Sequence, residues 1–401
     1  YWRKLNIKTA FSGRSIHDLQ RSQTETQSAV SSVRGQPHGN GTDRLRNILR
    51  AGKSRGNGSH LAQTYSLNLS IIWIQYNIGW MKPYEMVTKQ NYKGILSTIG
   101  NTPEVELENL SPNPAVKIIA KLEGQNPTGS VKDRIALRMI EQAERAGDLS
   151  KDKTILEPTS GNTGISLAMI GRLKGYKVTV VMPENVSSER TQLLEAYGAE
   201  IIYSEGSLGT NGSIERAHEV YQSHPTDYIM MYQYGNEANP EAHYHGTALE
   251  IINNHPDMDM FVAGLGTGGT LMGNARRLKE HNPDIKVVAV APEPDDFISG
   301  LRRLEDGFIP PILDISLLDA RLMVGSYDAF HTTKRLLNEE GIFAGVSSGS
   351  VVHAAIKQAE RVEQGKIVCL LADGGWKYLS TSLWTKDYSD LERESKGKIW
   401  W

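Results

Sequence analysis

The sequence predicts an α/β fold built on parallel β-sheets that carry helices on both faces. From residue 88 onward, short and nearly continuous apolar runs alternate with segments of helical periodicity. Strands buried on both faces appear as continuous apolar runs, and intervening helices are typical of parallel pairing. Glycine-rich loops follow several of these runs, at the strand ends where open α/β sheets bind their ligands.

Seven segments are predicted as strands because they are short, apolar and rich in β-branched residues. They are residues 116–120, 154–156, 178–182, 200–203, 261–263, 287–290 and 366–371. Amphipathic helices are predicted between them, for example over residues 135–145 and 188–197. Gly198 is predicted to end the second of these helices, since glycine adopts the left-handed backbone of a helix C-terminus without strain.

The composition is that of a globular protein with one segment of different character. The 401 residues include 39% hydrophobic residues and carry a net charge of −2, which allows two domains and gives no indication of nucleic-acid binding. Residues 1–60 hold 11 Lys and Arg against 3 Asp and Glu, and the remainder holds 33 against 43. Residues 1–80 are therefore predicted to be disordered or translated upstream sequence, with an Arg- and Ser-rich transit peptide as the functional alternative.

No membrane span and no metal site are predicted. Polar residues interrupt the apolar stretch around residues 71–74, and a spanning helix needs about 20 predominantly apolar residues. The single cysteine, Cys369, is predicted to be a buried strand residue. His243 and His245 lack a third ligand at suitable spacing, so we expect them to help start a helix after Asn239-Pro240.

Two motifs indicate the chemistry. Residues 126–134 (NPTGSVKDR) place Lys132 just inside the start of a helix, and residues 157–164 (EPTSGNTG) form a loop between an apolar strand and another helix. Such a loop presents backbone N–H groups and hydroxyls to an anion. A reactive amine beside it is what an enzyme needs to hold an aldehyde cofactor and an amino-acid substrate together. The alternative for Lys132 is a solvated helix residue.

A third motif, residues 264–270 (GLGTGGT), joins a predicted strand to a helix. Its glycines allow the backbone to fold tightly around phosphate oxygens, and its threonines add hydroxyl donors. A dinucleotide site is not predicted, because this motif lies late in the chain. Residues 345–349 form another loop that opens a helix, and residues 373–381 follow the last predicted strand. An ordinary tight turn is the alternative for each loop taken alone.

Taken together, residues 92 to about 385 resemble the β-family (fold type II) of pyridoxal-phosphate enzymes, and within it the B-type cysteine synthases, which are O-acetylserine or O-phosphoserine sulfhydrylases. The resemblance rests on motifs that occur in family order. They are GNTP at 100–103, NPTGSVKDR at 126–134, EPTSGNTGIS at 157–166, QYGN at 233–236, GLGTGGTLMG at 264–273, GIFAGVSSGS at 341–350 and GWKYLST at 375–381.

The resemblance implies a tryptophan-synthase-β-like architecture of two three-layer domains with the active site in the cleft between them. The smaller, mobile domain would span residues 124–229. The larger, cofactor-binding domain would combine residues 88–123 with residues 230–390. Residues 391–401 would form a C-terminal tail.

The resemblance also implies roles for individual residues. Lys132 would join the cofactor aldehyde covalently and then act as base at the substrate α-carbon, and Asn162 would hydrogen-bond the cofactor's phenolic oxygen. Ser347 would face the pyridine nitrogen, with Ser348 as the competing candidate. The cofactor phosphate would be held by Gly266, Thr267, Gly268, Gly269 and Thr270.

The implied substrate site has two parts. Its carboxylate-binding residues would be Thr159, Ser160, Thr163 and Gln233. Arg302 aligns with an arginine that phosphoserine-using relatives place near the leaving group, and a surface helix arginine is the alternative. The terminal residues 396–401 resemble tails of relatives that accept sulfur from a small thiocarboxylated carrier protein.

The activity implied is a pyridoxal-phosphate-dependent β-replacement that makes L-cysteine from O-phosphoserine or O-acetylserine and a sulfur donor. Sulfide, thiosulfate and a carrier protein remain open as donors. The resemblance implies a homodimer, and a location in the cytoplasm is expected. A cystathionine β-synthase-like or serine/threonine dehydratase activity is the enzymatic alternative. A docking platform without catalysis is the alternative from another class.

Overall fold

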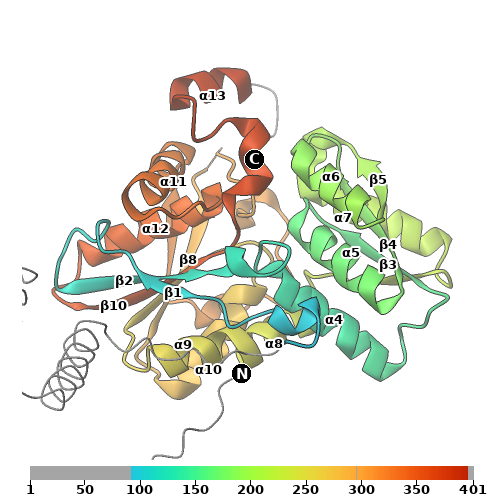
Figure 1. The fold of residues 1–401 in the computed structure, drawn as a ribbon, viewed down its shortest axis with the longest axis horizontal. Helices are drawn as coiled ribbons and strands as arrows, with labels where there is room; N and C mark the ends of the chain where they lie inside the picture. Colours follow the sequence, from blue (N-terminus) through green and yellow to red (C-terminus); the bar gives the residue numbers. More distant parts are fainter. Residues whose placement is uncertain (1–91, 295, 396–401) are drawn as a thin grey trace, which may run out of the picture. The chain divides into compact units, whose positions relative to one another are not determined.

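The computed structural model describes residues 92–294 and 296–395, which pack as part of one compact unit. Two β-sheets lie side by side in it, each with helices on both faces (Figure 1). This arrangement confirms the predicted α/β class. The predicted leader at residues 1–80 and the tail residues 396–401 lie outside the described residues.

The larger sheet has six strands in the order β1-β2-β10-β7-β8-β9. All neighbours pair in parallel except β1, which is antiparallel to β2. The strands are β1 (Glu104–Glu106), β2 (Val116–Leu122), β7 (Met260–Gly264), β8 (Lys286–Pro292), β9 (Ala320–Val324) and β10 (Gly365–Leu371).

Alternating side chains of the larger sheet build two separate cores. Ile118 on β2 packs with residues of α11 (Ser326–Glu340) and α12 (Val346–Ala359) on one face. Ile119, its neighbour in sequence, packs on the opposite face with residues of α10 (Gly269–His281). Strands buried on both faces must be apolar at every position, which is why these strands could be recognised from their continuous apolar runs.

The smaller sheet has four parallel strands in the order β5-β4-β3-β6. They are β3 (Thr154–Pro158), β4 (Lys177–Pro183), β5 (Glu200–Ser204) and β6 (Tyr228–Met230). One face packs against helices α4 (Lys132–Ala146) and α5 (Asn162–Lys174), and α7 (Gly209–Ser223) packs against the other. Helix α6 (Ser188–Ala196) lies against α5 and the 3-10 helix η8 (Gly375–Thr381).

The remaining elements connect these layers. A helical run beside α10 consists of α8 (Ala238–Ala242), a π-helical turn η5 (His243–Thr247) and α9 (Ala248–Asn254). Helix α13 (Tyr388–Ser395) ends the described residues. The short 3-10 helices are η2 (Ile95–Thr98), η3 (Glu123–Gln125), η4 (Gly206–Leu208), η6 (Leu304–Asp306) and η7 (Ile315–Leu317).

All seven predicted strands are present, most of them one or two residues longer than expected. Three strands, β1, β6 and β9, were not predicted. Gly198 has a φ of +77° after α6, so its predicted role at the helix end is confirmed. The predicted domain bounds at residues 124 and 230 stay a prediction. In the described part of the chain, no helix has the length and apolar character needed to cross a membrane.

Candidate active site

A cavity of about 120 Å³ lies where the carboxyl ends of the two sheets meet. It brings together most of the residues that the sequence analysis singled out. Those that line it are Lys132, Thr159, Ser160, Asn162, Thr163, Gln233, Gly266, Thr267 and Arg302. A second cavity of about 30 Å³ shares Lys132 and Gly266 with the first, and Gly268, Thr270 and Ser347 also line it. Gly269 alone among the predicted residues lines neither.

Lys132 is the first residue of α4 and faces both cavities. The turn before it is fixed at Gly129, whose φ is +80° and where a Cβ would come within 2.3 Å of the Trp376 ring. The N–H of Val131 donates to Ala372 at the end of β10, at 2.8 Å. Burial lowers the pKa of Lys132, although the charge of Asp373 opposes the shift. A lowered pKa favours the neutral amine, the form that attacks an aldehyde or accepts a proton.

Asn162 is the first residue of α5, and both the nitrogen and the oxygen of its side-chain amide are hydrogen-bonded. Its Nδ2 donates to Oδ2 of Asp373 at 2.7 Å, and its Oδ1 accepts from Nζ of Lys377 at 2.7 Å. Lys377 is fully buried, and burial lowers its pKa to about 8. Both partners lie in the segment after the last strand, which the sequence analysis noted without giving these residues a role.

The Thr159–Thr163 loop is joined to Gln233 of the segment after β6. Oγ1 of Thr163 donates to Oε1 of Gln233 at 2.7 Å, and Nε2 of Gln233 donates to the Pro158 carbonyl at 3.3 Å. Gly161 has a φ of +147°, a conformation that L-residues rarely adopt. The loop is thus fixed with its hydroxyls and backbone N–H groups at the cavity wall.

Glu157 is fully buried and contacts Gln233. Sequence reasoning assigned it no role. Its Oε1 accepts the backbone N–H of Gln233 at 3.3 Å, while its Oε2 is buried without a hydrogen-bond partner among the described residues. Burial raises the pKa of Glu157 from an ordinary 4.5 to about 8. The carboxyl is therefore neutral in the folded protein at neutral pH.

This raised pKa predicts a pH dependence of stability. Between pH 4.5 and 8 the folded state holds a proton on Glu157 that the unfolded state has lost. The contribution of this group to the free energy of unfolding therefore falls as pH rises, by about 1.4 kcal/mol per pH unit. Glu157→Gln removes the titration, so urea unfolding at several pH values should give a flatter profile for the variant. If the free energy of unfolding changed equally with pH in the wild type and in Glu157→Gln, the prediction would be contradicted.

The glycine-rich turn lies between β7 and the N-terminus of α10. Gly268 has a φ of +91°, and a Cβ at Gly269 would come within 1.9 Å of Oδ1 of Asn239. Nδ2 of Asn239 donates to Oγ1 of Thr267 at 3.0 Å. Gly269 therefore packs behind the turn, where only glycine fits, and its neighbours present backbone N–H groups at a helix N-terminus.

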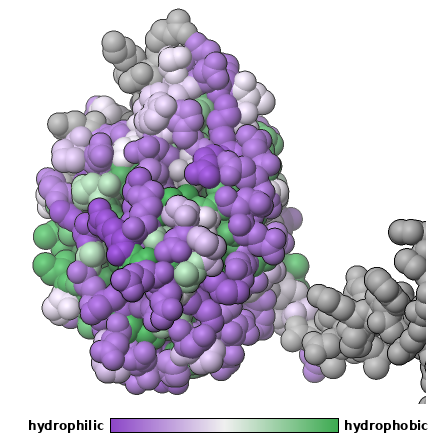
Figure 2. Space-filling view, turned by 90° about the vertical axis from the view of Figure 1, so that its left-hand side faces the viewer, coloured by the Kyte–Doolittle hydropathy of each residue, from purple (hydrophilic) through white to green (hydrophobic). Residues whose placement is uncertain are grey.

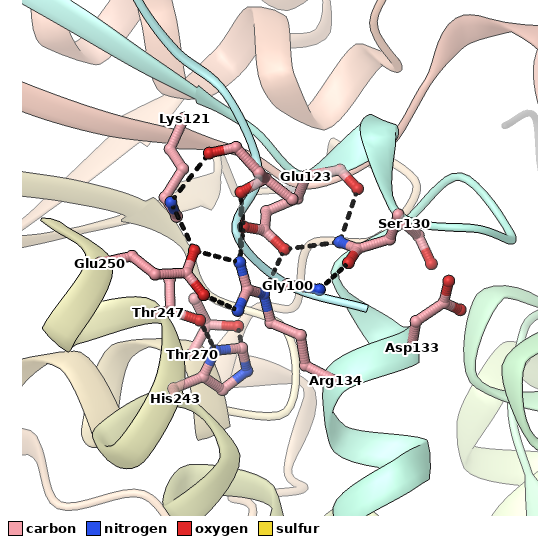
Figure 3. A network of polar contacts seen from close by, with 12 residues as sticks. Gly100, Lys121, Glu123, Ser130, Asp133, Arg134, His243, Thr247, Glu250 and Thr270 are labelled. Carbon is pink, nitrogen blue, oxygen red and sulfur yellow. Dashed lines mark hydrogen bonds and ion pairs between the residues drawn. The ribbon is translucent and has the colours of Figure 1, made fainter. Parts of the chain in front are cut away.

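His243 supports the same turn, which corrects its expected role at a helix start. It lies inside the helical run, in η5, where it is buried. Its Nε2 is 3.3 Å from Oγ1 of Thr270, and its Nδ1 is 3.0 Å from Oγ1 of Thr247 (Figure 3). Burial, helped by the charge of Arg134, lowers the pKa of His243 to about 3, so the ring is neutral. No group of three His, Cys, Asp or Glu side chains in the described residues is arranged to hold a metal ion.

Ser347 and Ser348 occupy different environments at the start of α12. Ser347 lines the smaller cavity, where a Cβ at Gly300 would lie 3.6 Å from its Oγ. Ser348 is fully buried and lines neither cavity, and its Oγ has no hydrogen-bond partner among the described residues. Of the two, Ser347 is the serine that a ligand in the cavity would meet.

Arg302 is not the surface helix residue that was its alternative reading, because residues 299–303 are not helical. It lines the cavity and its Nη1 donates to Oδ1 of Asn211 on α7 at 2.9 Å. Its guanidinium lies 4.8 Å from the Phe308 ring centroid and 5.4 Å from that of Tyr234. Each of these partners of Arg302 among the described residues is neutral.

Arg190 of α6 is a second arginine in the cavity wall, and sequence reasoning missed it. It is only 4% exposed. Its Nη2 donates to Oγ of Ser299 at 2.9 Å, and its guanidinium lies 4.9 Å from the Tyr378 ring centroid. Within an amphipathic helix the sequence gives no signal that distinguishes this arginine from a solvated one. With it, the described residues that line the cavity include two arginines and Lys132, and no carboxylate.

A buried network of ion pairs surrounds Arg134 in the first turn of α4 (Figure 3). Arg134, two residues after Lys132, donates from Nε to Glu123 at 2.7 Å and from Nη1 to Glu250 at 2.6 Å. Glu250 also pairs with Lys121 at 2.8 Å. Burial opposes ionisation of Glu123, but Arg134 keeps the pKa of that carboxyl below its ordinary value.

These residues fit a phosphorylated aldehyde cofactor. A buried amine with a lowered pKa stands in the same cavity as a glycine-rich turn at a helix N-terminus. Asp373, beside Asn162, has a buried Oδ1 without a hydrogen-bond partner among the described residues. Lys132 suits the aldehyde, and the turn suits the phosphate.

Comparisons with known proteins agree with this chemistry. Residues 95–373 match the model of the pyridoxal-phosphate dependent enzyme family. A cysteine synthase of Staphylococcus aureus (strain N315) is 45% identical over 303 residues, which cover 73% of this chain and 97% of the relative. A cysteine synthase (OASS) structure from Entamoeba histolytica has a TM-score of 0.70 at 35% identity and covers 77% of this chain and 96% of its own.

A hydrogen sulfide-producing enzyme from Fusobacterium nucleatum is also similar, with a TM-score of 0.68 at 42% identity, covering 72% of this chain and 100% of its own. The fold, the cavity and these relatives lead to one conclusion. The chain is an enzyme that depends on pyridoxal phosphate and belongs to the cysteine synthase family.

Proposed function

We propose that this enzyme makes L-cysteine by β-replacement on O-phospho-L-serine, with a sulfur donor as the second substrate. One observation carries the choice of substrate: the described residues of the cavity wall include two arginines, Arg190 and Arg302, and no carboxylate. O-phosphoserine brings a carboxylate and a dianionic phosphate. Guanidinium groups bind phosphate through paired, charge-assisted donors, so Arg302 suits this leaving group.

The roles of Lys132, Asn162 and Ser347 follow from their places in the cavities. The cofactor, when bound, withdraws electrons from the substrate's α-carbon. Lys132 would hold the cofactor's aldehyde carbon covalently and would move the proton at the α-carbon, as its lowered pKa supports. Asn162 would donate to the phenolic oxygen, and Ser347 would face the pyridine nitrogen. The phosphate-binding residues would be Gly266, Thr267, Gly268 and Thr270, with Gly269 packed behind them.

The substrate carboxylate would bind the loop at the N-terminus of α5. Its ligands would be Thr159, Ser160, Thr163 and Gln233. The hydrogen bond between Thr163 and Gln233 supports this assignment, because it joins two of the four residues at the cavity wall. Such preorganisation reduces the cost of ordering the site on binding.

The test of the substrate choice is Arg302→Gln. A charge-assisted hydrogen bond contributes about 1.5–3 kcal/mol, so kcat/KM for O-phosphoserine should fall about 10- to 100-fold. O-acetylserine has no charge on its leaving group, and its kcat/KM should change less than about threefold. Steady-state assays with sulfide as the common nucleophile measure both. Arg216→Gln is the matched control, because Arg216 is exposed and pairs with Glu219 away from the cavity.

O-acetylserine is the second candidate substrate. An O-acetylserine sulfhydrylase isoform from Entamoeba histolytica is 36% identical, which favours it. Wild-type enzyme that prefers O-acetylserine, or an Arg302→Gln variant that loses both activities equally, would contradict the proposal for O-phosphoserine.

The proposal also includes a homodimer, a location in the cytoplasm and a carrier protein as the source of sulfur. The resemblance to cysteine synthases supports all three features. On the face shown in Figure 2, apolar side chains lie scattered among hydrophilic ones. Light scattering of the purified protein measures the oligomeric state directly.

A further inference from the structure

Arg190 is a buried cation whose hydrogen-bond partner, Ser299, is neutral. It is 4% exposed and lines the cavity, yet it forms no ion pair with any carboxylate of the described residues. Its Nε is buried and lacks a hydrogen-bond partner among those residues. Burying a charged donor without a partner is costly, so its presence indicates a ligand that supplies the missing negative charge.

The two arginines of the cavity share one loop. Arg190 reaches from α6, beside the smaller sheet, to Ser299 in the loop after β8. Arg302, three residues later in that loop, reaches in the opposite direction to Asn211 on α7. Both side chains therefore cross between the two sheets, and both end on a neutral side chain.

Packing fixes where the Arg190 side chain runs. Its aliphatic part lies against the carboxylate-binding loop, since a Cβ at Gly161 would come within 2.6 Å of its Cδ. Its guanidinium packs on the Tyr378 ring on the other side. An amino acid whose carboxylate binds this loop carries its leaving group only a few bonds away, inside the cavity that Ser299 and Arg302 also line.

We propose that Arg190 binds the phosphate of O-phosphoserine together with Arg302 and is a specificity-determining residue of this enzyme. The inference rests on the proposed function for its substrate. One guanidinium supplies a single pair of parallel donors, and a dianionic phosphate accepts two such pairs. Two arginines anchored on the same loop match that requirement.

The experiment uses the cofactor-loaded full chain and the variants Arg190→Gln, Arg190→Lys and Arg190→Gln/Arg302→Gln. In each, kcat/KM is measured with O-phosphoserine and with O-acetylserine, with sulfide as nucleophile. Inhibition of the O-acetylserine reaction by inorganic phosphate is measured beside it. Arg216→Gln again controls for the loss of one positive charge, and thermal unfolding confirms that each variant is folded.

For Arg190→Gln we expect kcat/KM to fall at least about tenfold with O-phosphoserine and less than about threefold with O-acetylserine. The inhibition constant of phosphate should rise by a similar factor, and Arg190→Lys should recover part of both losses. Equal loss with both substrates would overturn the inference, because a residue that merely holds the two sheets together would affect them alike.

The measurement of inhibition by inorganic phosphate distinguishes a failure of this inference from a failure of the proposed function. Preference of the wild type for O-acetylserine would contradict the proposed substrate and would leave phosphate inhibition as the test of Arg190. An inhibition constant unchanged in Arg190→Gln would overturn the inference even if the wild type uses O-phosphoserine.

Discussion

Lys132→Ala is expected to abolish cysteine synthesis. The variant loses the amine that would hold the cofactor covalently and the base that would move the substrate's α-proton. Proton transfer by a positioned base alone contributes about 10²–10⁴-fold, so the rate should fall at least about 10³-fold. Cysteine formation measured with either activated serine tests this expectation.

Lys377 provides the comparison for this prediction. It is also buried, and burial lowers its pKa to about 8, but its Nζ is engaged with Asn162. Lys377→Met should therefore retain covalent capture of the cofactor, whereas Lys132→Ala should lose it. A Lys132→Ala enzyme that still makes cysteine at nearly the wild-type rate would contradict the assignment.

Arg134→Met is expected to cost more stability than any other substitution considered. Arg134 is buried between Glu123 and Glu250, and its removal leaves two carboxylates facing each other with one cation fewer (Figure 3). Breaking a buried pair in this way typically costs about 3–5 kcal/mol, because an uncompensated charge remains in the interior. Urea unfolding of wild type and variant measures the difference.

Arg138→Met is the matched control, one helical turn further along α4. Arg138 pairs with Glu241 at 2.9 Å, but both side chains are about one-third exposed. Exposed pairs contribute about 0–1 kcal/mol, so this variant should unfold close to wild type. If Arg134→Met and Arg138→Met lost equal free energy of unfolding, the buried ion-pair network would not be the cause of the loss.

The sequence predicted the central strands well and missed strands at sheet edges. The seven predicted strands include every strand with neighbours on both sides, and burial makes those continuous apolar runs. The three missed strands, β1, β6 and β9, all lie at edges. Glu104–Glu106 is charged at both ends and Tyr228–Met230 has only three residues, so neither carries the apolar pattern of a central strand.

The residues of the candidate site also fall into two groups, those that a local sequence pattern reveals and those that it does not. Lys132 and the glycine-rich turn have local signatures, because a helix start and a tight turn restrict which residues can stand there. The contacts of Asn162 with Asp373 and of Arg190 with Ser299 join residues that are 211 and 109 positions apart. Only the packing of one sheet beside the other creates them, so no local pattern could reveal Arg190, Glu157 or Lys377 as parts of the site.

The most direct test of the account is to identify the lysine that holds the cofactor. The purified protein is loaded with pyridoxal phosphate, treated with borohydride to make the bond permanent, digested and analysed by mass spectrometry. The added mass is expected on the peptide that contains Lys132. Added mass on the Lys377 peptide instead, or no modified peptide from a protein that makes cysteine, would contradict it.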